Sequence, residues 1–165
     1  MSASPAAEQK VVKVLFVCLG NICRSPTAEA VFQTKVAEAG LSHRISTDSC
    51  GTGDWHIGKA PDSRSIQKAK ERGYQLDHLR ARQICQNDFL AFDYIFAMDM
   101  QNLADLNDLQ EAGDVEPELF LNWSEKFKGE AVPDPYYGSG EGFYDVLDRV
   151  EDASNGFLNF LKKSL

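Results

Sequence analysis

The sequence is poor in cysteine, in histidine and in long hydrophobic runs. Residues 1–9 are small and polar, so we expect neither a signal peptide nor a membrane span, and we expect a cytoplasmic protein. The four cysteines show no zinc-ribbon spacing, and the chain is neither short nor evidently secreted. We therefore expect reduced thiols, no disulfide framework, no metal and no cofactor.

Positive charge is also scarce. The chain has 17 Lys and Arg residues against 25 Asp and Glu residues, which gives a net charge of -8 at pH 7. Because nucleic acids and anionic membranes attract basic surfaces, neither is an expected partner. With 165 residues, 43% of them hydrophobic, we predict one globular domain over 1–165, with residues 1–10 as a flexible tail.

Apolar runs rich in β-formers alternate with helical patterns along the rest of the chain. This alternation is typical of an α/β fold, in which helices cover the faces of a parallel sheet. An irregular loop rich in Gly and Pro is expected over 123–142. We predict strands over 11–17, 45–50, 94–98 and 118–121, helices over 26–39, 61–72, 101–112 and 143–161, and a short turn over 89–92.

A cysteine and an arginine flank the loop between the first strand and the first helix. Cys18 ends the strand pattern, and Pro26 suits the first turn of the helix. Gly20 and Asn21 allow a tight loop, because Asn tolerates left-handed backbone angles. Backbone amides at a helix N-terminus attract anions, and Arg24 adds a bidentate fork. The segment therefore predicts a phosphate site.

The same charges favour the thiolate form of Cys18. A thiolate that faces a bound phosphate is a nucleophile, so we predict in-line attack of the Cys18 sulfur on a phosphate ester. The product would be a cysteinyl-phosphate that water hydrolyses. The alternative is a buried cysteine with an unrelated, exposed arginine. The strand before the loop and the helix after it favour the catalytic interpretation.

Two motifs resemble the low-molecular-weight protein tyrosine phosphatases. One is VCLGNICRSP over 17–26, and the other is DPYY over 134–137. Intervening blocks agree in the family's order, so the resemblance covers nearly the whole chain. It implies a three-layer α/β sandwich, whose four-stranded parallel sheet has the order 2-1-3-4 with helices on both faces. It also implies a protein-tyrosine-phosphatase that acts on small aryl phosphates and has acid phosphatase activity.

The resemblance assigns roles to residues of both motifs. Asp134 is the general acid, and its carboxylate then activates the attacking water. Trp55 and Leu19 flank the substrate crevice. So do Tyr136 and Tyr137, which are candidate phosphorylation sites themselves. The resemblance places the phosphate and substrate contacts of the loop at Leu19, Gly20, Asn21, Ile22, Cys23 and Ser25.

Further supporting roles also follow from the resemblance. Asn21 belongs to a hydrogen-bond network with Ser49 and His78 that holds the loop ready for phosphate. Ser25 is a candidate to donate a hydrogen bond to the catalytic thiolate and to cap the helix, and both roles can hold at once. Cys23 forms a reversible disulfide with the catalytic cysteine, which protects the thiolate from irreversible oxidation; a small loop filler is the alternative.

Two other functions share parts of this pattern. A thioredoxin-coupled arsenate reductase has the same loop but needs a further cysteine pair, and only Cys85 lies near the expected region. A non-catalytic phosphotyrosine-binding or redox-sensing module would keep the loop, but intact Cys18, Arg24 and Asp134 favour hydrolysis. Expected partners are phosphotyrosine-containing proteins, with a cognate tyrosine kinase as a further candidate. We expect a monomer, with weak dimerisation as the alternative.

Overall fold

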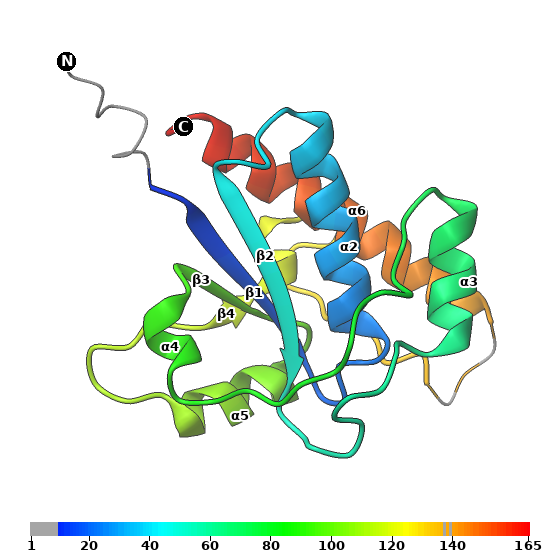
Figure 1. The fold of residues 1–165 in the computed structure, drawn as a ribbon, viewed down its shortest axis with the longest axis horizontal. Coiled ribbons are helices and arrows are strands. Elements are labelled where there is room, and N and C mark those ends of the chain that lie inside the picture. The colour runs from blue at the N-terminus through cyan, green and yellow to red at the C-terminus, as the bar shows by residue number, and fades with distance from the viewer. Residues whose placement is uncertain (1–9, 137, 139) are drawn as a thin grey trace.

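A four-stranded parallel sheet forms the centre of the molecule (Figure 1). The computed structural model describes residues 10–136, 138 and 140–165, so residues 1–9 of the predicted tail and Tyr137 lie outside the described residues. The strand order is β2-β1-β3-β4, which confirms the expected order. The strands are β1 Val12–Cys18, β2 Ile45–Gly51, β3 Tyr94–Ala97 and β4 Glu118–Leu119.

Helices cover both faces of this sheet, as expected. The first and last long helices pack together on one face, and two shorter helices lie on the other (Figure 1). Asp62 caps the N-terminus of α3 by accepting a hydrogen bond from the Arg64 amide at 2.8 Å. The helices are α2 Arg24–Glu38, α3 Ser63–Glu71, α4 Asp88–Ala91, α5 Met100–Leu109 and α6 Glu141–Lys162.

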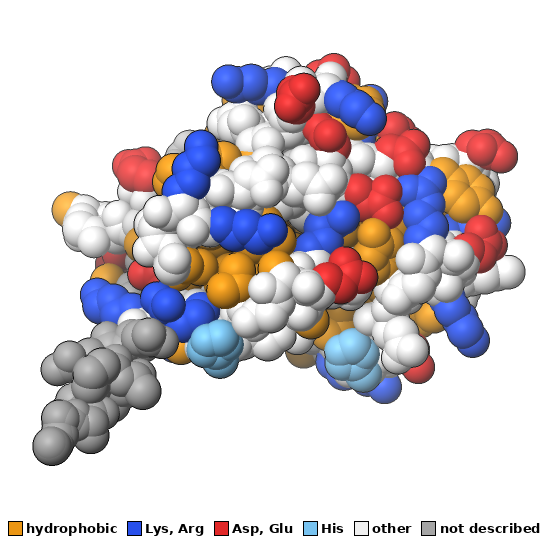
Figure 2. All heavy atoms as spheres, turned by 90° about the horizontal axis from the view of Figure 1, so that it is seen from above, with side chains coloured by type: hydrophobic (Ala, Val, Ile, Leu, Met, Phe, Trp, Pro, Cys, Tyr) orange, Lys and Arg blue, Asp and Glu red, His pale blue; other side chains and the backbone are white. Residues whose placement is uncertain are grey.

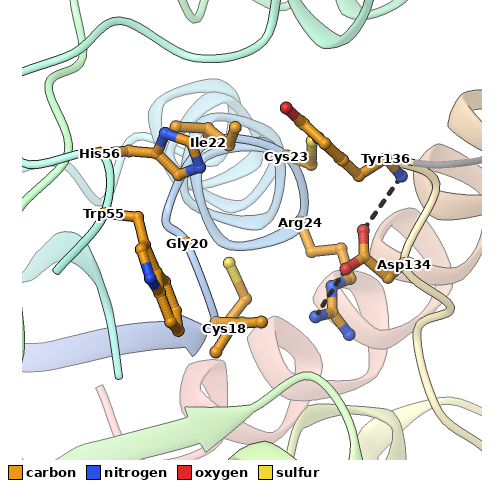
Figure 3. A pocket seen from close by; sticks show the side chains of 10 residues that line it. Cys18, Gly20, Ile22, Cys23, Arg24, Trp55, His56, Asp134 and Tyr136 are labelled. Carbon is orange, nitrogen blue, oxygen red and sulfur yellow. Dashed lines mark hydrogen bonds and ion pairs between the residues drawn. The ribbon is translucent and has the colours of Figure 1, made fainter. Parts of the chain in front are cut away.

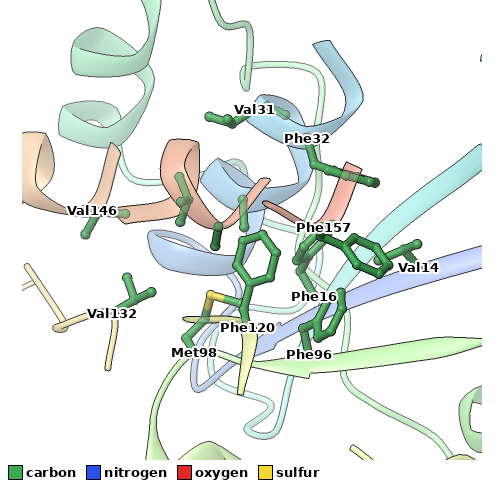
Figure 4. Packing of buried hydrophobic residues seen from close by; sticks show 14 of the residues in the cluster. Val14, Phe16, Val31, Phe32, Phe96, Met98, Phe120, Val132, Val146 and Phe157 are labelled. Atoms are coloured by element: carbon green, nitrogen blue, oxygen red, sulfur yellow. The ribbon is translucent and has the colours of Figure 1, made fainter. Parts of the chain in front are cut away.

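Two hydrophobic cores flank β1, because its side chains alternate between the faces of the sheet. Val14 and Phe16 pack toward α2 and α6, where Phe16 meets Phe120 edge-on with the ring centroids 5.0 Å apart (Figure 4). Leu15 and Val17 pack on the opposite face, toward α4 and α5. Burial on both sides fixes the position of the strand's last residue.

The fourth strand is shorter than the sequence predicts. Only its first two residues pair with β3, and Phe120 and Leu121 belong to a 3-10 helix, η1 (Phe120–Trp123). This helix packs against α6, where the ring centroids of Trp123 and Phe157 lie 5.1 Å apart. The strand prediction for Phe120 and Leu121 is wrong, because a short apolar run fits a buried helical turn as well as a strand.

The carboxyl ends of the strands meet at one edge of the sheet, the lower edge in Figure 1. Cys18 ends β1 and Gly51 ends β2 at this edge, which is where open α/β sheets bind ligands. Figure 2 shows the molecule from above, where acidic and basic side chains are interspersed. Within the described ranges, no helix combines the length and the apolar content needed to cross a membrane.

Candidate active site

The segment between β1 and α2 forms a tight loop around the Cys18 sulfur. Asn21 has a backbone φ of 57°, which confirms the predicted left-handed angle, and its amide donates to Cys18 Sγ at 3.3 Å. Gly51 supports the loop from β2, since a Cβ there would lie 2.6 Å from the Leu19 carbonyl oxygen. The amides of the two residues after Gly51 donate to loop carbonyl oxygens, both at 2.9 Å. The close approach of β2 therefore fixes the loop.

The Cys18 thiol lies on the floor of a cavity of about 360 Å³. Cys18 is only 2% exposed, and Ser25 Oγ lies 3.0 Å from its sulfur. The hydroxyl proton of Ser25 can go to this sulfur or to the Cys50 carbonyl oxygen at 3.3 Å, and an ionised sulfur is the stronger acceptor. The predicted role of Ser25 as a helix cap is wrong, because Cys23 occupies the N-cap of α2.

Arg24 is buried beside the thiol and is held by polar partners. Its Nη1 donates to Asp99 Oδ2 at 2.5 Å and to the Val132 carbonyl oxygen at 3.1 Å. Burial alone would lower the pKa of Arg24, but the charges of Cys18 and Asp99 outweigh burial and raise the pKa above its usual value. The guanidinium therefore stays charged, and its remaining N–H groups can bind two oxygens of a phosphate.

Asp134 lies at the same cavity, beside the Arg24 guanidinium (Figure 3). Its Oδ2 is 3.7 Å from Arg24 Nη2, and its Oδ1 accepts a hydrogen bond from the Tyr136 amide at 3.0 Å. The side chain is 39% exposed, so a proton on it can exchange with solvent. Two motifs far apart in the sequence therefore meet at one cavity, with the Cys18 thiol at its floor and a carboxyl group beside it.

Apolar and aromatic side chains form the walls of the cavity. His56, which sequence reasoning missed, also lines it, and its ring centroid lies 6.4 Å from that of Tyr136. Its position next to Trp55 in a turn-rich segment was the available signal. The predicted contact residues that line the cavity are Leu19, Gly20, Ile22, Cys23, Trp55 and Tyr136.

A buried hydrogen-bond network holds Asn21 from behind the loop. Its Nδ2 donates to Ser25 Oγ at 2.8 Å and to Ser49 Oγ at 3.0 Å, so Ser49 lies where it was expected. The Arg82 backbone amide donates to Asn21 Oδ1 at 3.0 Å. The prediction for His78 is wrong: its side chain is exposed, and among the described residues no hydrogen bond joins it to this network. Among the described residues, the partner of Asn21 Oδ1 is the backbone amide of Arg82.

Comparisons with known proteins agree with this geometry. The family model of the low molecular weight phosphotyrosine protein phosphatases matches residues 13–165. The chain belongs to this family. A member from Schizosaccharomyces pombe is 48% identical over 151 residues, which cover 90% of this chain and 96% of the relative. These findings confirm the family that the two motifs indicate.

Solved structures of phosphatases share the fold. A protein tyrosine phosphatase from Entamoeba histolytica matches with a TM-score of 0.89 at 41% identity, covering 93% of this chain and 98% of that one. YfkJ from Bacillus subtilis matches with a TM-score of 0.88 at 36% identity, covering 95% of this chain and 98% of that one. The three-layer architecture is therefore the one that relatives in the family have.

Cys18 and Cys23, at the two ends of the loop between β1 and α2, are both free thiols. Burial raises the pKa of Cys23 to about 12, and the charge of Asp62 adds to this effect. Cys23 therefore stays a protonated thiol at neutral pH. The reversible disulfide between Cys18 and Cys23 stays a prediction.

A buried carboxyl group, which sequence reasoning missed, supports the loop between β1 and α2 from the side of α2. Glu29 is 6% exposed and accepts a hydrogen bond from Ser49 Oγ at 2.6 Å. Because Ser49 also accepts from Asn21, a chain of hydrogen bonds joins Glu29 to the loop. Burial raises the pKa of Glu29 to about 7, although the hydrogen bond from Ser49 opposes the rise. This glutamate is buried because the first turns of α2 are covered on all sides.

Glu29→Gln is expected to flatten the pH dependence of folding stability. The pKa of Glu29 is 4.5 in its usual state and about 7 in the folded chain, so the folded chain binds more protons between these values. The free energy of unfolding therefore falls as pH rises through this range. Its total decrease across the range is about 3 kcal/mol. Urea unfolding at about pH 5 and about pH 8 should show a smaller fall for the variant.

Glu38→Gln provides the control, because Glu38 is an exposed carboxylate on the same helix. This variant should keep the fall in stability of the parent protein. If the free energy of unfolding of Glu29→Gln fell between the two pH values by as much as that of the native protein, the buried carboxyl group would not be the source of the fall.

Proposed function

We propose that this phosphatase hydrolyses phosphotyrosyl and small aryl phosphate monoesters through a cysteinyl-phosphate intermediate. The observation that carries this proposal is the Cys18 thiol on the floor of a cavity, between the Arg24 guanidinium and the amide of Asn21. A phosphate that enters the cavity would meet a nucleophile and donors for its oxygens at once.

In the first step, the Cys18 thiolate attacks phosphorus and the bond from phosphorus to the ester oxygen breaks. Arg24 and the loop amides bind the other phosphate oxygens as charge spreads over them. Asp134 donates its proton to the departing phenolic oxygen, because a phenolate with a pKa near 10 is a poor leaving group. The products of this step are a phenol and the cysteinyl-phosphate.

In the second step, water attacks the phosphorus of the cysteinyl-phosphate. Asp134, now a carboxylate, takes the proton of this water, and the bond between sulfur and phosphorus breaks. The sulfur leaves as a thiolate, and Ser25, whose Oγ lies 3.0 Å from it, donates a hydrogen bond to the developing charge. Inorganic phosphate leaves and the enzyme returns to its starting state.

The walls of the cavity favour an aromatic ester. Leu19, Ile22 and Trp55 offer apolar surface to a planar ring, and the Tyr136 ring adds an aromatic wall. Trp55 is 65% exposed, which leaves its indole available to a substrate. Proteins that carry phosphotyrosine fit this site, because the phenyl ring would separate the phosphate on the cavity floor from the polypeptide outside.

Asp134→Asn is expected to reduce turnover most for esters with basic leaving groups. Asparagine cannot donate a proton, so hydrolysis of a phosphotyrosyl peptide should fall by about 10² to 10³. Hydrolysis of p-nitrophenyl phosphate should fall by about tenfold at most, because its leaving group needs little protonation. Steady-state kcat on the two substrates measures the difference.

The control for this comparison is Asp77→Asn, which removes an exposed carboxylate from the loop after α3. It should leave kcat unchanged on both esters. Equal losses on the two esters in Asp134→Asn would exclude Asp134 as the general acid and would leave the nucleophile of the proposal untouched.

A further inference from the structure

A second hollow of about 310 Å³ lies beside the catalytic cavity. Leu19 and Trp55 line both spaces, so the Trp55 indole separates them. Beyond the indole the hollow is lined by Asp105, Asp108 and Leu109, all from α5. We propose that this hollow, here named the acidic groove, binds a lysine or arginine side chain within two residues of the phosphotyrosine. This proposal rests on the proposed function.

The partition between cavity and groove is part of the loop after β2. The Trp55 ring lies against Gly53 so closely that a Cβ at that position would overlap the ring. The Gly53 amide in turn donates to the Leu19 carbonyl oxygen at 2.9 Å. A hydrogen bond therefore joins the segment that carries the indole to the loop that follows Cys18, and Figure 3 shows Trp55 and Cys18 lining the same cavity.

The groove carries negative charge that the described part of the chain does not neutralise. Asp105 and Asp108 are three residues apart on α5, so they lie on one face of the helix. Asp105 accepts a hydrogen bond from Gln101 Nε2 at 3.0 Å. The Gln101 side chain is uncharged, so this bond does not neutralise the carboxylate. Over residues 10–136, 138 and 140–165, no Lys or Arg side chain forms an ion pair with either carboxylate.

A basic side chain matches both parts of this lining. Leu19, Leu109 and the Trp55 ring can cover the aliphatic stem of lysine or arginine, while the two carboxylates meet the charged end. The indole face adds a cation–π contact. An acidic side chain would instead face two like charges. The net charge of -8 acts in the same direction, because it attracts basic segments of substrates.

The distance between the two sites suits neighbouring residues of one peptide. With the phosphotyrosine ring in the cavity, the peptide backbone lies outside its mouth, next to the exposed Trp55. Each residue of an extended peptide advances the backbone by about 3.5 Å. A long side chain one or two residues away can therefore pass over the indole and enter the acidic groove.

The test compares phosphotyrosyl peptides that differ only at the residues flanking the phosphotyrosine, with lysine, norleucine or glutamate there. For the native protein, we expect kcat/KM for the lysine peptide to exceed that for the glutamate peptide by about tenfold at low salt. The norleucine peptide should fall between them. Raising the salt to about 0.5 M should reduce the preference, because ions screen exposed charges.

The double variant Asp105→Asn/Asp108→Asn should lower the preference for lysine over glutamate to within about twofold. Its kcat/KM for p-nitrophenyl phosphate should stay unchanged, because this small ester occupies only the cavity. The matched control is Glu38→Gln/Asp77→Asn, which makes the same change in net charge at exposed sites away from the groove. The control should keep the preference.

Three results would overturn the proposal. One is a double variant that keeps the preference for lysine, and another is a control that loses it equally. The third is a norleucine peptide hydrolysed as well as the lysine peptide, which would make the groove an apolar subsite. A native protein that hydrolyses no aryl phosphate at all would instead contradict the proposed function, so the two failures are distinguishable.

Discussion

Cys18→Ser is expected to lower turnover by about four orders of magnitude or more. A serine hydroxyl fits the same position, but it is not ionised and needs a base to activate it. The groups described beside the Cys18 sulfur are the Ser25 hydroxyl and the Asn21 amide, and neither accepts a proton readily. Steady-state hydrolysis of p-nitrophenyl phosphate measures the loss.

The proposed cysteinyl-phosphate allows a second measurement on Cys18→Ser. After rapid quenching with acid, mass spectrometry should find a phosphoryl group on the native protein and none on the variant. The variant should still bind a phosphotyrosyl peptide, because the loop amides and Arg24 are unchanged. Cys85→Ser, at an exposed cysteine outside the cavity, should keep full turnover. A phosphoryl group on Cys18→Ser at any position other than 18 would place the nucleophile elsewhere.

The position of Cys18 at the cavity could be predicted because the signals for this loop are local. A buried strand, a tight loop and a helix start occupy one short stretch, and Asn21 has the left-handed angle that its residue type allows. The α/β class followed from the alternation of strands and helices. The strand order came from the family resemblance, since no property of a strand's own sequence names its neighbours in the sheet.

Features that depend on tertiary packing could not be predicted in this way. Asp99 has the pattern of a helix N-cap, and its Oδ1 does accept from the Asn102 amide at 2.7 Å. Its second oxygen binds Arg24 only because β3 lies beside β1. His78 shows the converse: its side chain is exposed, so the network role that the motif resemblance gave it does not hold in this structure. Glu29 is buried by its surroundings rather than by its residue type.

Arg24→Lys is expected to lower kcat/KM by about 10² to 10³, although the charge is kept. The guanidinium holds Asp99 and the Val132 carbonyl oxygen with Nη1 and still has N–H groups for the phosphate. An ammonium is a single point charge that cannot serve both partners and two phosphate oxygens. Most of the loss should lie in kcat, because these oxygens carry the charge that spreads in the transition state.

Arg72→Lys separates this effect from a general cost of the substitution. Arg72 also pairs with two carboxylates, at 2.8 Å to Asp148 and 2.9 Å to Glu151, but it does not line the cavity. The same chemical change there should leave kcat/KM within about twofold. If Arg24→Lys stayed within about fivefold of the native protein, a point charge would suffice at this position. The catalytic requirement would then be the charge beside the thiolate, and the planar fork would serve only to hold Asp99.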